Sequence, residues 1–396
     1  MSSATRVPSL QQGRFLGVKG FNRFGGRHCE TGALRKVLAH SGAEYTEEFL
    51  FGMAGGIGFV FWNQAGMSVP FVGGRNGKFP EYIASLGEAL GHKITVNQTS
   101  SARRAYAALT AELEQGRPVA CYGDILHLPY FHTNRHFGGH AFVVYAIDEP
   151  NDSVWISDRG EYPRRITLSD LARARSSDTS VFRPNHAQLQ VEVNPAAELS
   201  AAGVWHAIGR SRRAMCEPPI SNLGLAGIAK FGKWLNGAID DLHGEALSEL
   251  LVSLYVNLEL AGTGGCAFRK MYRQFLIEAK EFITGNGLDE AIDSLGRSVE
   301  AWGAFIDGLL PPVGAACIEL KQQLQAKERV FEKAPAHEVH AAAGHAKRIG
   351  ELIHPAGEEL TAARGELKAG LEFLKQIAGW ESAAFEAVVR ARGREL

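Results

Sequence analysis

The sequence predicts an α+β fold with a mixed N-terminal half and an all-helical C-terminal half, and three observations predict it. The chain has 396 residues, a length that favours two domains. Short β-branched and aromatic runs between turn residues occur only before about residue 196. Beyond that point, helical periodicity with charged opposite faces continues almost to the C-terminus. We therefore expect one domain at 1–195 and a helical domain at 196–396.

The N-terminal half mixes predicted helices and strands. Apolar residues at helical spacing predict helices over Cys29–His40 and Ala105–Glu114, and Thr167 is a suitable N-cap for a short helix ending at Arg175. Four runs predict strands, namely Val119–Tyr122, Ala141–Ile147, Val154–Ser157 and Leu189–Val193. The turn residues Asp148–Ser153 join the second and third runs, so these two should form an antiparallel hairpin.

The C-terminal half predicts helices separated by glycine and proline. The breaks are Gly285–Gly287, Pro311–Pro312 and Pro335. The predicted helices are Ala226–Asn236, Glu245–Leu260, Phe268–Thr284, Leu288–Gly308, Pro312–Lys333 and Glu358–Gly379.

Composition excludes several classes of protein. Lys+Arg is 42 and Asp+Glu is 43, so the chain lacks the basic excess of a nucleic-acid binder. The five cysteines form no C-x-x-C pair, which argues against a zinc site or a disulfide framework. No apolar run is long enough for a membrane helix, and Met1–Pro8 has no secretory pattern. We expect a reduced, cytoplasmic protein without nucleic-acid or membrane partners.

The segment Phe21–Leu34 carries the strongest signal for chemistry. A loop containing Gly25 and Gly26 delivers Cys29 to the first turn of an amphipathic helix. Free N–H groups and the helix dipole stabilise a thiolate there, and can lower a cysteine pKa from ~8.5 into the ~3.5–7.5 range. One interpretation of Cys29 is a nucleophile, and the other is a small, buried apolar residue.

His140 and Asp158 should lie at one end of the predicted hairpin. His140 begins one strand after two glycines, and Asp158 follows the end of the next. Asp158 could accept a hydrogen bond from one ring nitrogen while the other nitrogen faces a nucleophile. Each residue alone is more often structural. The order of a cysteine on a helix, a histidine starting a strand and an aspartate ending the next favours a catalytic triad.

Other polar residues are weaker candidates. Four histidines between residues 127 and 140 suggest a metal site, but proline and glycines interrupt the helix that would align them, so we expect no metal. Cys121 lies within a predicted strand and is best interpreted as a core residue. Asp124 could hold a cationic amine, although a strand-end turn is the simpler interpretation.

The order of these residues resembles the papain-like cysteine enzymes, most closely the bacteriocin-leader peptidases. More narrowly, several stretches resemble the butirosin biosynthesis protein H family, namely Gly25–Thr31, Leu50–Gly58, Phe71–Arg75, Leu128–Phe131 and Gly138–His140. Gly262–Leu276 resembles the most recognisable stretch of the helical domain that follows in that family. The resemblance extends to about residue 330 and leaves the final helices unmatched.

This resemblance implies a papain-like catalytic domain covered by a helical domain. It implies an acyltransferase of antibiotic biosynthesis that moves an acyl group from a thioester, through an acyl-enzyme on Cys29, to a small-molecule amine. The donor would be an acyl carrier protein or coenzyme A, with no cofactor beyond the phosphopantetheine that such a donor could carry. His140 would transfer protons and Asp158 would orient its ring.

The resemblance also suggests where substrates bind. Related cysteine enzymes place a Gln before the nucleophile as an oxyanion donor, and Asn22 is the candidate here. Substrate-binding candidates are Arg75, Asp124, Tyr130, Arg269 and Tyr272. Arg269 and Tyr272 share one helical turn, so they could point into the cleft between the domains or form an ordinary polar face. We expect Gly262–Tyr272 to approach the catalytic face and contribute to the acyl pocket.

Two other functions remain open. The same triad could serve a cysteine amidase or peptidase that uses water as acceptor, or the fold could be a non-catalytic scaffold that binds a carrier protein. Carrier proteins are acidic, so docking would need a basic patch or would involve ordinary surface arginines. The densest basic positions are Arg164, Arg165, Arg173, Arg175, Arg210, Arg212 and Arg213. A homo-oligomer also remains open.

Overall fold

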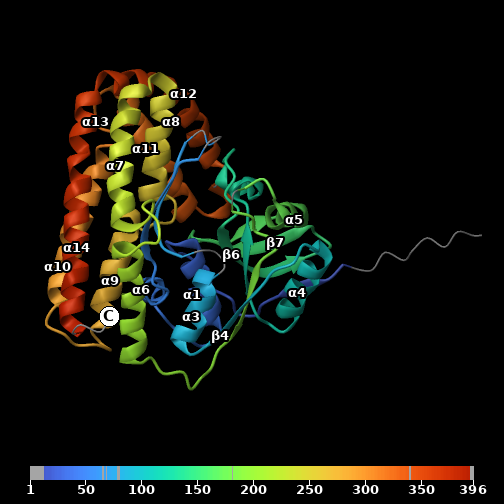
Figure 1. Cartoon of the computed structure of the whole chain (residues 1–396). Coiled ribbons are helices and arrows are strands. Elements are labelled where there is room, and N and C mark those ends of the chain that lie inside the picture. Colours follow the sequence, from blue (N-terminus) through green and yellow to red (C-terminus); the bar gives the residue numbers. More distant parts are fainter. Residues whose placement is uncertain are drawn as a thin grey trace, which may run out of the picture.

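The computed structural model describes residues 13–64, 67, 69–77, 81–180, 182–338 and 340–392. Within them the chain is an α+β protein with an antiparallel sheet and a helical C-terminal region (Figure 1). Figure 1 shows the long helices packed side by side on one side of the molecule and the sheet on the other. Met1–Pro8, considered above for targeting, lies outside the described residues.

The main sheet has seven strands, all paired antiparallel. Its order is β4-β9-β5-β6-β7-β8, and β1 also pairs with β6. Its strands are β1 (Phe15–Gly17), β4 (Lys93–Asn97), β5 (Val119–Gly123), β6 (His140–Asp148), β7 (Ser153–Ser157), β8 (Arg164–Ile166) and β9 (Gln188–Glu192). A separate hairpin joins β2 (Ile57–Trp62) to β3 (Phe71–Arg75). The predicted β6–β7 hairpin is confirmed, whereas the sequence patterns above did not predict β1–β4 or β8.

Five α-helices accompany the strands. They are α1 (Cys29–His40), α2 (Glu47–Met53), α3 (Glu81–Leu90), α4 (Ala102–Glu114) and α5 (Leu168–Ser176). Two short 3₁₀ turns follow β5, at η1 (Ile125–His127) and η2 (Pro129–Phe131). The predicted α1 begins at Cys29, and Thr167 caps α5 by a reciprocal capping box with Asp170.

Alternate residues of the central strands face two different cores. On β5, Ala120 and Tyr122 join the larger core that α1 and the C-terminal helices share. Val119 and Cys121 point the other way, into a second core with residues of α4 and α5. Successive side chains of a strand point to opposite faces of the sheet. The residues that face the larger core are therefore on the face that α1 covers. Cys121 lies on the face opposite to α1.

The C-terminal region is helical from Ala201 onward. Its α-helices are α6 (Ala201–Cys216), α7 (Gly224–Asp241), α8 (Gly244–Tyr255), α9 (Arg269–Ala279), α10 (Leu288–Asp307), α11 (Ala315–Lys333), α12 (Ala341–Ala362), α13 (Arg364–Gly370) and α14 (Glu372–Arg392). A π-helical turn, η3 (Val256–Leu260), and 3₁₀ turns η4 (Cys266–Phe268) and η5 (Ala336–Glu338) lie between them. The predicted helix 358–379 is helical over nearly all its residues, but its bounds are wrong, because the region is divided among the end of α12, α13 and the start of α14. Pro355 lies inside α12.

Two glycines of the N-terminal half allow the helical region to pack closely against it. A Cβ atom on Gly52 of α2 would lie 1.8 Å from the ring of Phe275 on α9. A Cβ on Gly74 of β3 would lie 2.3 Å from the carbonyl oxygen of Ala267. The glycine-rich stretches near residues 55 and 73 therefore serve close packing between the two halves.

None of the helices among the described residues is long and apolar enough to cross a membrane.

Candidate active site

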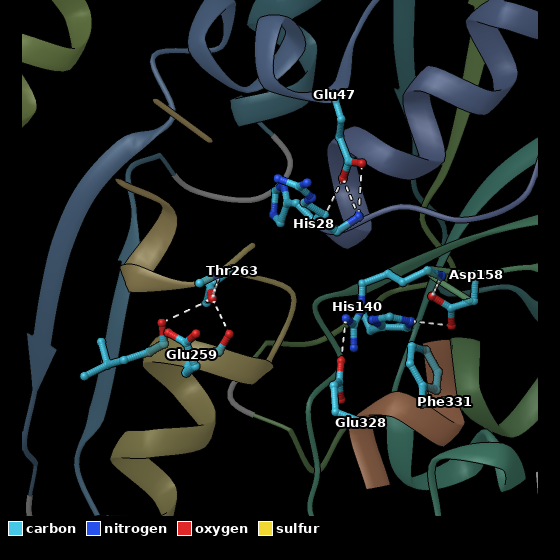
Figure 2. A network of polar contacts seen from close by, with 12 residues as sticks. His28, Glu47, His140, Asp158, Glu259, Thr263, Glu328 and Phe331 are labelled. Atoms are coloured by element: carbon cyan, nitrogen blue, oxygen red, sulfur yellow. Dashed lines mark hydrogen bonds and ion pairs between the residues drawn. The ribbon is translucent and has the colours of Figure 1, made fainter. Parts of the chain in front are cut away.

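Cys29 is the first residue of α1 and is half-buried. His28 is the N-cap residue, and its ring Nδ1 lies 3.0 Å from the hydroxyl of Thr31. The carboxylate of Glu47, from α2, accepts hydrogen bonds from the backbone N–H of Arg27 at 3.0 Å and of His28 at 2.5 Å (Figure 2). The start of the helix is therefore fixed by groups before and beside the cysteine.

His140 and Asp158 form a buried hydrogen-bonded pair at the open end of the β6–β7 hairpin (Figure 2). The His140 Nε2 atom lies 2.7 Å from Oδ2 of Asp158. The hydroxyl of Tyr130 donates to the same Oδ2 atom at 2.7 Å, and the N–H of Arg159 donates to Oδ1 at 2.7 Å. Both carboxylate oxygens are thus satisfied, and the acid is held in one orientation.

The charges of His140 and Asp158 shift the pKa of both residues. Burial alone would lower the pKa of His140, but the Asp158 charge and hydrogen bonds to Asp158 and Cys29 raise it to about 9. Burial alone would raise the pKa of Asp158, yet His140, Arg159 and Tyr130 hold it well below its usual range. Both shifts favour an imidazolium hydrogen-bonded to a carboxylate at neutral pH.

The structure places Cys29 near the His140 ring. Its side chain is close enough to help raise the pKa of His140. Because Nε2 is engaged by Asp158, Nδ1 is the ring nitrogen left for the sulfur. Cys121 faces the second core and is fully buried, which raises the pKa of its thiol. The three residues chosen from the sequence therefore meet, and their catalytic action remains a prediction.

A second buried polar cluster lies beside Cys29. Glu30 is 2% exposed; Arg75 pairs with its carboxylate at 3.0 Å, and Tyr122 donates to it at 3.1 Å. Arg75 also lies over the ring of Tyr82, 4.4 Å from its centroid. Burial raises the pKa of Glu30, and Arg75 opposes that shift. Arg75, a substrate-binding candidate, is thus held beside the nucleophile helix by a neighbouring glutamate.

The helical region covers the His140–Asp158 pair. The ring of Phe331 on α11 stacks 4.9 Å from Phe131 and lies 4.6 Å from the guanidinium of Arg159. Glu328, one turn earlier, accepts from Arg159 at 2.8 Å (Figure 2). α11 thereby fixes the residue that directly follows Asp158.

The loop between η3 and α9 approaches the residues before Cys29. A Cβ on Gly262 would lie 3.1 Å from the carbonyl oxygen of Arg27 and 3.4 Å from Cδ of Arg159. The ring of Phe268 meets that of His28 at 5.2 Å. Gly262 has a φ of 72°, and the backbone of Phe268 is also left-handed. The expected approach of Gly262–Tyr272 to this face is present in these contacts.

A cavity of about 310 Å³ borders this site at Arg159. It lies between the Cys29 loop, the η3 loop and one face of α11, and neither Cys29 nor His140 lines it. Its lining residues are Arg27, Arg159, Glu259, Leu260, Gly262, Gly264, Gly265, Gln325, Glu328, Arg329 and Glu332. Most of the lining side chains are charged, and Leu260 is the apolar one among them. Because neither Cys29 nor His140 lines it, the cavity is not itself the expected acyl pocket.

Two candidates from the sequence have other surroundings. Asn22 is exposed and makes no side-chain hydrogen bond within the described part of the chain. Asp124 is fully buried and accepts from Ser177 and from His136, each at 2.7 Å, as well as from backbone N–H groups. Its carboxylate is occupied within a strand-end turn, so it is not free to hold an amine.

Arg269 and Tyr272 lie in the protein core instead of a cleft. The guanidinium of Arg269 is fully buried and pairs with Glu381 of α14 at 2.7 Å. It also donates to the carbonyl oxygens of Gly58 and Ala267. The ring of Tyr272 is buried against Phe275 and Phe385. The sequence predicted that Arg269 and Tyr272 share one helical turn. Both side chains lie in the core, where Arg269 connects α9 to α14 and to β2.

The arginines proposed as a basic patch do not form one exposed surface. Arg164 and Arg175 are buried, and Arg164 donates to the carbonyl oxygens of Phe331 and Ala334. Arg173 pairs with Asp170, and Arg212 pairs with Glu217. Most of these positions are thus structural or locally neutralised.

Several residues of the site carried no sequence signal. Glu47, Arg159, Glu328 and Phe331 reach it from different elements, and their partners are distant in sequence. Arg159 could have been predicted most easily from the sequence, because it directly follows Asp158. No described group of three or more His, Cys, Asp or Glu side chains could hold a metal ion.

The fold and the site define an α+β protein in which a cysteine begins a helix. A histidine and an aspartate lie near it at the open end of a hairpin, and the C-terminal helices pack over this site. Residues 28–159 match the family described as butirosin biosynthesis protein H, N-terminal. Residues 169–341 match a domain of unknown function, DUF4872. The chain therefore contains a butirosin biosynthesis protein H N-terminal domain, followed by this second domain in its C-terminal region. No curated protein matches the sequence.

Proposed function

We propose that the protein is a cysteine-dependent acyltransferase with a papain-like catalytic domain, acting in the biosynthesis of an antibiotic or a similar specialised metabolite. The donor is an acyl thioester, carried by an acyl carrier protein or coenzyme A, and the acceptor is a small-molecule amine. The single observation that supports this most is the buried His140–Asp158 hydrogen bond with the half-buried Cys29 beside it. The family's link to butirosin biosynthesis supports the biological setting.

The first step is acylation of Cys29. The sulfur attacks the thioester carbonyl carbon, a new C–S bond forms, and the C–S bond to the leaving thiol breaks. An imidazolium at His140, favoured by its pKa of about 9, stabilises the attacking thiolate and gives its proton to the leaving thiolate. Asp158 keeps the ring oriented throughout.

The second step transfers the acyl group to the amine. The neutral amine attacks the acyl-enzyme carbonyl, a C–N bond forms, and Cys29 leaves as a thiolate. His140, now neutral, accepts the proton that the nitrogen loses. The ring returns to its imidazolium form, so atoms and charge balance over the cycle.

The oxyanion of both steps needs hydrogen-bond donors at the start of α1. The backbone N–H of Cys29 lies in the first turn, where helical N–H groups have no partner within the helix. Asn22 is an unsuitable second donor because it is exposed. The backbone N–H groups at the start of α1 are therefore the oxyanion donors that we propose.

The cavity at Arg159 favours a polar acceptor over a long alkyl group. Glu332, one of its lining residues, has a pKa raised by burial and by the nearby charge of Glu328. Arg27, Arg159 and Arg329 offset the three glutamates of the lining. These charged and hydrogen-bonding side chains suit a polar acceptor better than an alkyl chain.

Partitioning between amine and water tests the function. The protein is incubated with a panel of coenzyme A and carrier-protein thioesters, with and without primary amines, and the products are measured by mass spectrometry. Transfer predicts an amide that depends on both amine and enzyme. Release of free acid alone, at a rate independent of amine, would favour the hydrolase alternative. Absence of both reactions, with binding of a carrier protein, would favour the scaffold.

A further inference from the structure

The carboxylate of Glu47 lies at the N-terminus of the nucleophile helix although Glu47 belongs to α2. The residue is 6% exposed. Its Oε1 atom accepts from the N–H of both Arg27 and His28, and its Oε2 atom accepts from that of Arg27 (Figure 2). These are the last two N–H groups before Cys29. A side chain from elsewhere therefore caps the loop that delivers the cysteine.

Two glycines beside Cys29 make room for this carboxylate. A Cβ on Gly26 would lie 3.4 Å from Oε2 of Glu47, and a Cβ on Gly32 would lie 3.1 Å from Oε1. Gly32 lies in the first turn of α1, where a glycine weakens a helix. The spacing of these glycines around Cys29 is thus explained by the position of Glu47.

We propose that Glu47 is a positioning residue for Cys29: it fixes the loop through the N–H groups of Arg27 and His28, and its charge opposes negative charge on the cysteine sulfur. This inference rests on the proposed function of Cys29 as the nucleophile. With the N–H groups of Arg27 and His28 occupied, the N–H of Cys29 is the next donor along the chain for the reacting carbonyl oxygen. Glu47 thus sets both the direction of that donor and the ease of thiolate formation.

Other charges face these two residues. Lys36 and Arg35 of α1 act on Glu47, and Lys36 is itself buried, with its Nζ atom 2.5 Å from the carbonyl oxygen of Asp158. The groups within electrostatic reach of Cys29 are His140 on β6, Arg159 after β7, Arg75 on β3, Tyr82 on α3 and Tyr122 on β5. Glu30, next in sequence, is neutralised by Arg75. Three of these groups, His140, Arg159 and Arg75, carry positive charge, and Glu47 carries the opposite charge.

Two substitutions separate the two roles. Glu47→Gln keeps an oxygen that can occupy the Oε1 position and accept from both N–H groups, but it removes the charge. Glu47→Ala removes both charge and hydrogen bonds. Glu48→Gln is the matched control, because Glu48 is the next residue of α2 and loses the same charge, while its own partner is the side chain of Arg27 at 3.2 Å.

The experiment measures the rate at which iodoacetamide alkylates Cys29 between pH 4 and 10, by peptide mass spectrometry, in the intact chain. Glu47→Gln should lower the midpoint of this pH profile by about 0.5–1 unit, whereas Glu48→Gln should shift it by less than half as much. Thioester turnover per labelled Cys29 should stay within about threefold in Glu47→Gln and fall about a hundredfold in Glu47→Ala, because misplacement of a reacting group is costly.

The results distinguish the inference from the proposed function. A midpoint in Glu47→Gln equal to that of Glu48→Gln, or wild-type turnover per labelled site in Glu47→Ala, would overturn the role of Glu47 while leaving Cys29 as nucleophile. Failure of Cys29 to react in the wild type at any pH would overturn the proposed function and this inference together. If Glu47→Ala does not fold, the alkylation midpoints of Glu47→Gln and Glu48→Gln still decide whether the charge of Glu47 acts on Cys29.

Discussion

Tyr130 and His140 share one hydrogen-bond acceptor, the Oδ2 atom of Asp158, each at 2.7 Å. The three side chains are buried, and Phe331 of the helical region stacks against the ring of Tyr130. Tyr130 was a substrate-binding candidate from the sequence. Its contacts instead give it a role in setting how much of the Asp158 charge acts on His140.

Tyr130→Phe should therefore change the pH dependence of turnover. Without the hydroxyl, the Asp158 charge is shared by fewer donors and acts more strongly on His140, so the pKa of His140 rises. The alkaline limb of the kcat/KM profile should move up by roughly 0.5–1 unit, since a hydrogen bond to a charged group contributes about 1.5–3 kcal/mol. The measurement is a full pH–rate profile with an acyl thioester.

Tyr106→Phe is the control for this prediction. Tyr106 also donates to a carboxylate, Glu149, at 2.8 Å, but that pair lies outside the candidate site. Its profile should superimpose on the wild type. An unchanged alkaline limb in Tyr130→Phe would show that Tyr130 does not tune His140.

The His140–Asp158 pair should make stability depend on pH. His140 has a folded pKa of about 9, above its usual value of 6.5, so its contribution is complete below 6.5 and is lost as pH rises toward 9. Asp158 has a lowered pKa, so its contribution is present above 3.8 and is lost as pH falls through its folded pKa. The pair is most stabilising between these two usual values.

Urea denaturation of the wild type and Asp158→Asn tests this window. The difference in unfolding free energy should be greatest between about pH 4 and 6.5 and should shrink as pH rises to 9. A difference that stays constant across the whole range would contradict an ionised pair.

The ion pair of Arg269 with Glu381 should matter for stability and not for substrate binding. Both side chains are fully buried, and Glu381 also accepts from Ser298 and Trp302. Glu381→Ala would leave the arginine charge buried and unpaired, at a cost of about 3–5 kcal/mol. The measurement is chemical denaturation together with KM for the thioester at a temperature where the variant is folded.

Arg348→Ala provides the comparison at the surface. Arg348 makes a similar two-point contact with Glu319, at 2.7 Å on both oxygens, but both side chains are partly exposed. Because water screens such an exposed pair, its loss should destabilise the protein far less than Glu381→Ala does. A raised KM in Glu381→Ala without loss of stability would restore Arg269 as a substrate-binding residue.

Local patterns explain which features were predictable from the sequence. The start of α1 at Cys29, the β6–β7 hairpin and the Thr167 cap depend on residues a few positions apart. The hairpin register then places Asp158 near His140, so this part of the candidate site followed from short-range rules.

Long-range contacts explain what was missed. Nothing in the local sequence distinguishes Arg269 from an exposed polar residue of a helix. Its partner, Glu381, is 112 positions away in the sequence. Glu47 reaches the loop before Cys29 from another helix, with no local motif to indicate it. Gly52 and Gly74 lie in stretches noted only for their resemblance to a family, and the structure shows that they accommodate Phe275 and Ala267. Such pairings depend on how distant elements pack.

The central claim is that Cys29 carries the acyl group, and intact-protein mass spectrometry after incubation with acyl thioesters tests it most directly. We expect a mass increase of one acyl group, mapped to Cys29, that is absent in Cys29→Ala, retained in Cys121→Ala and removed when an acceptor amine is added. An acyl adduct that persists in Cys29→Ala, or that is lost in Cys121→Ala, would contradict it.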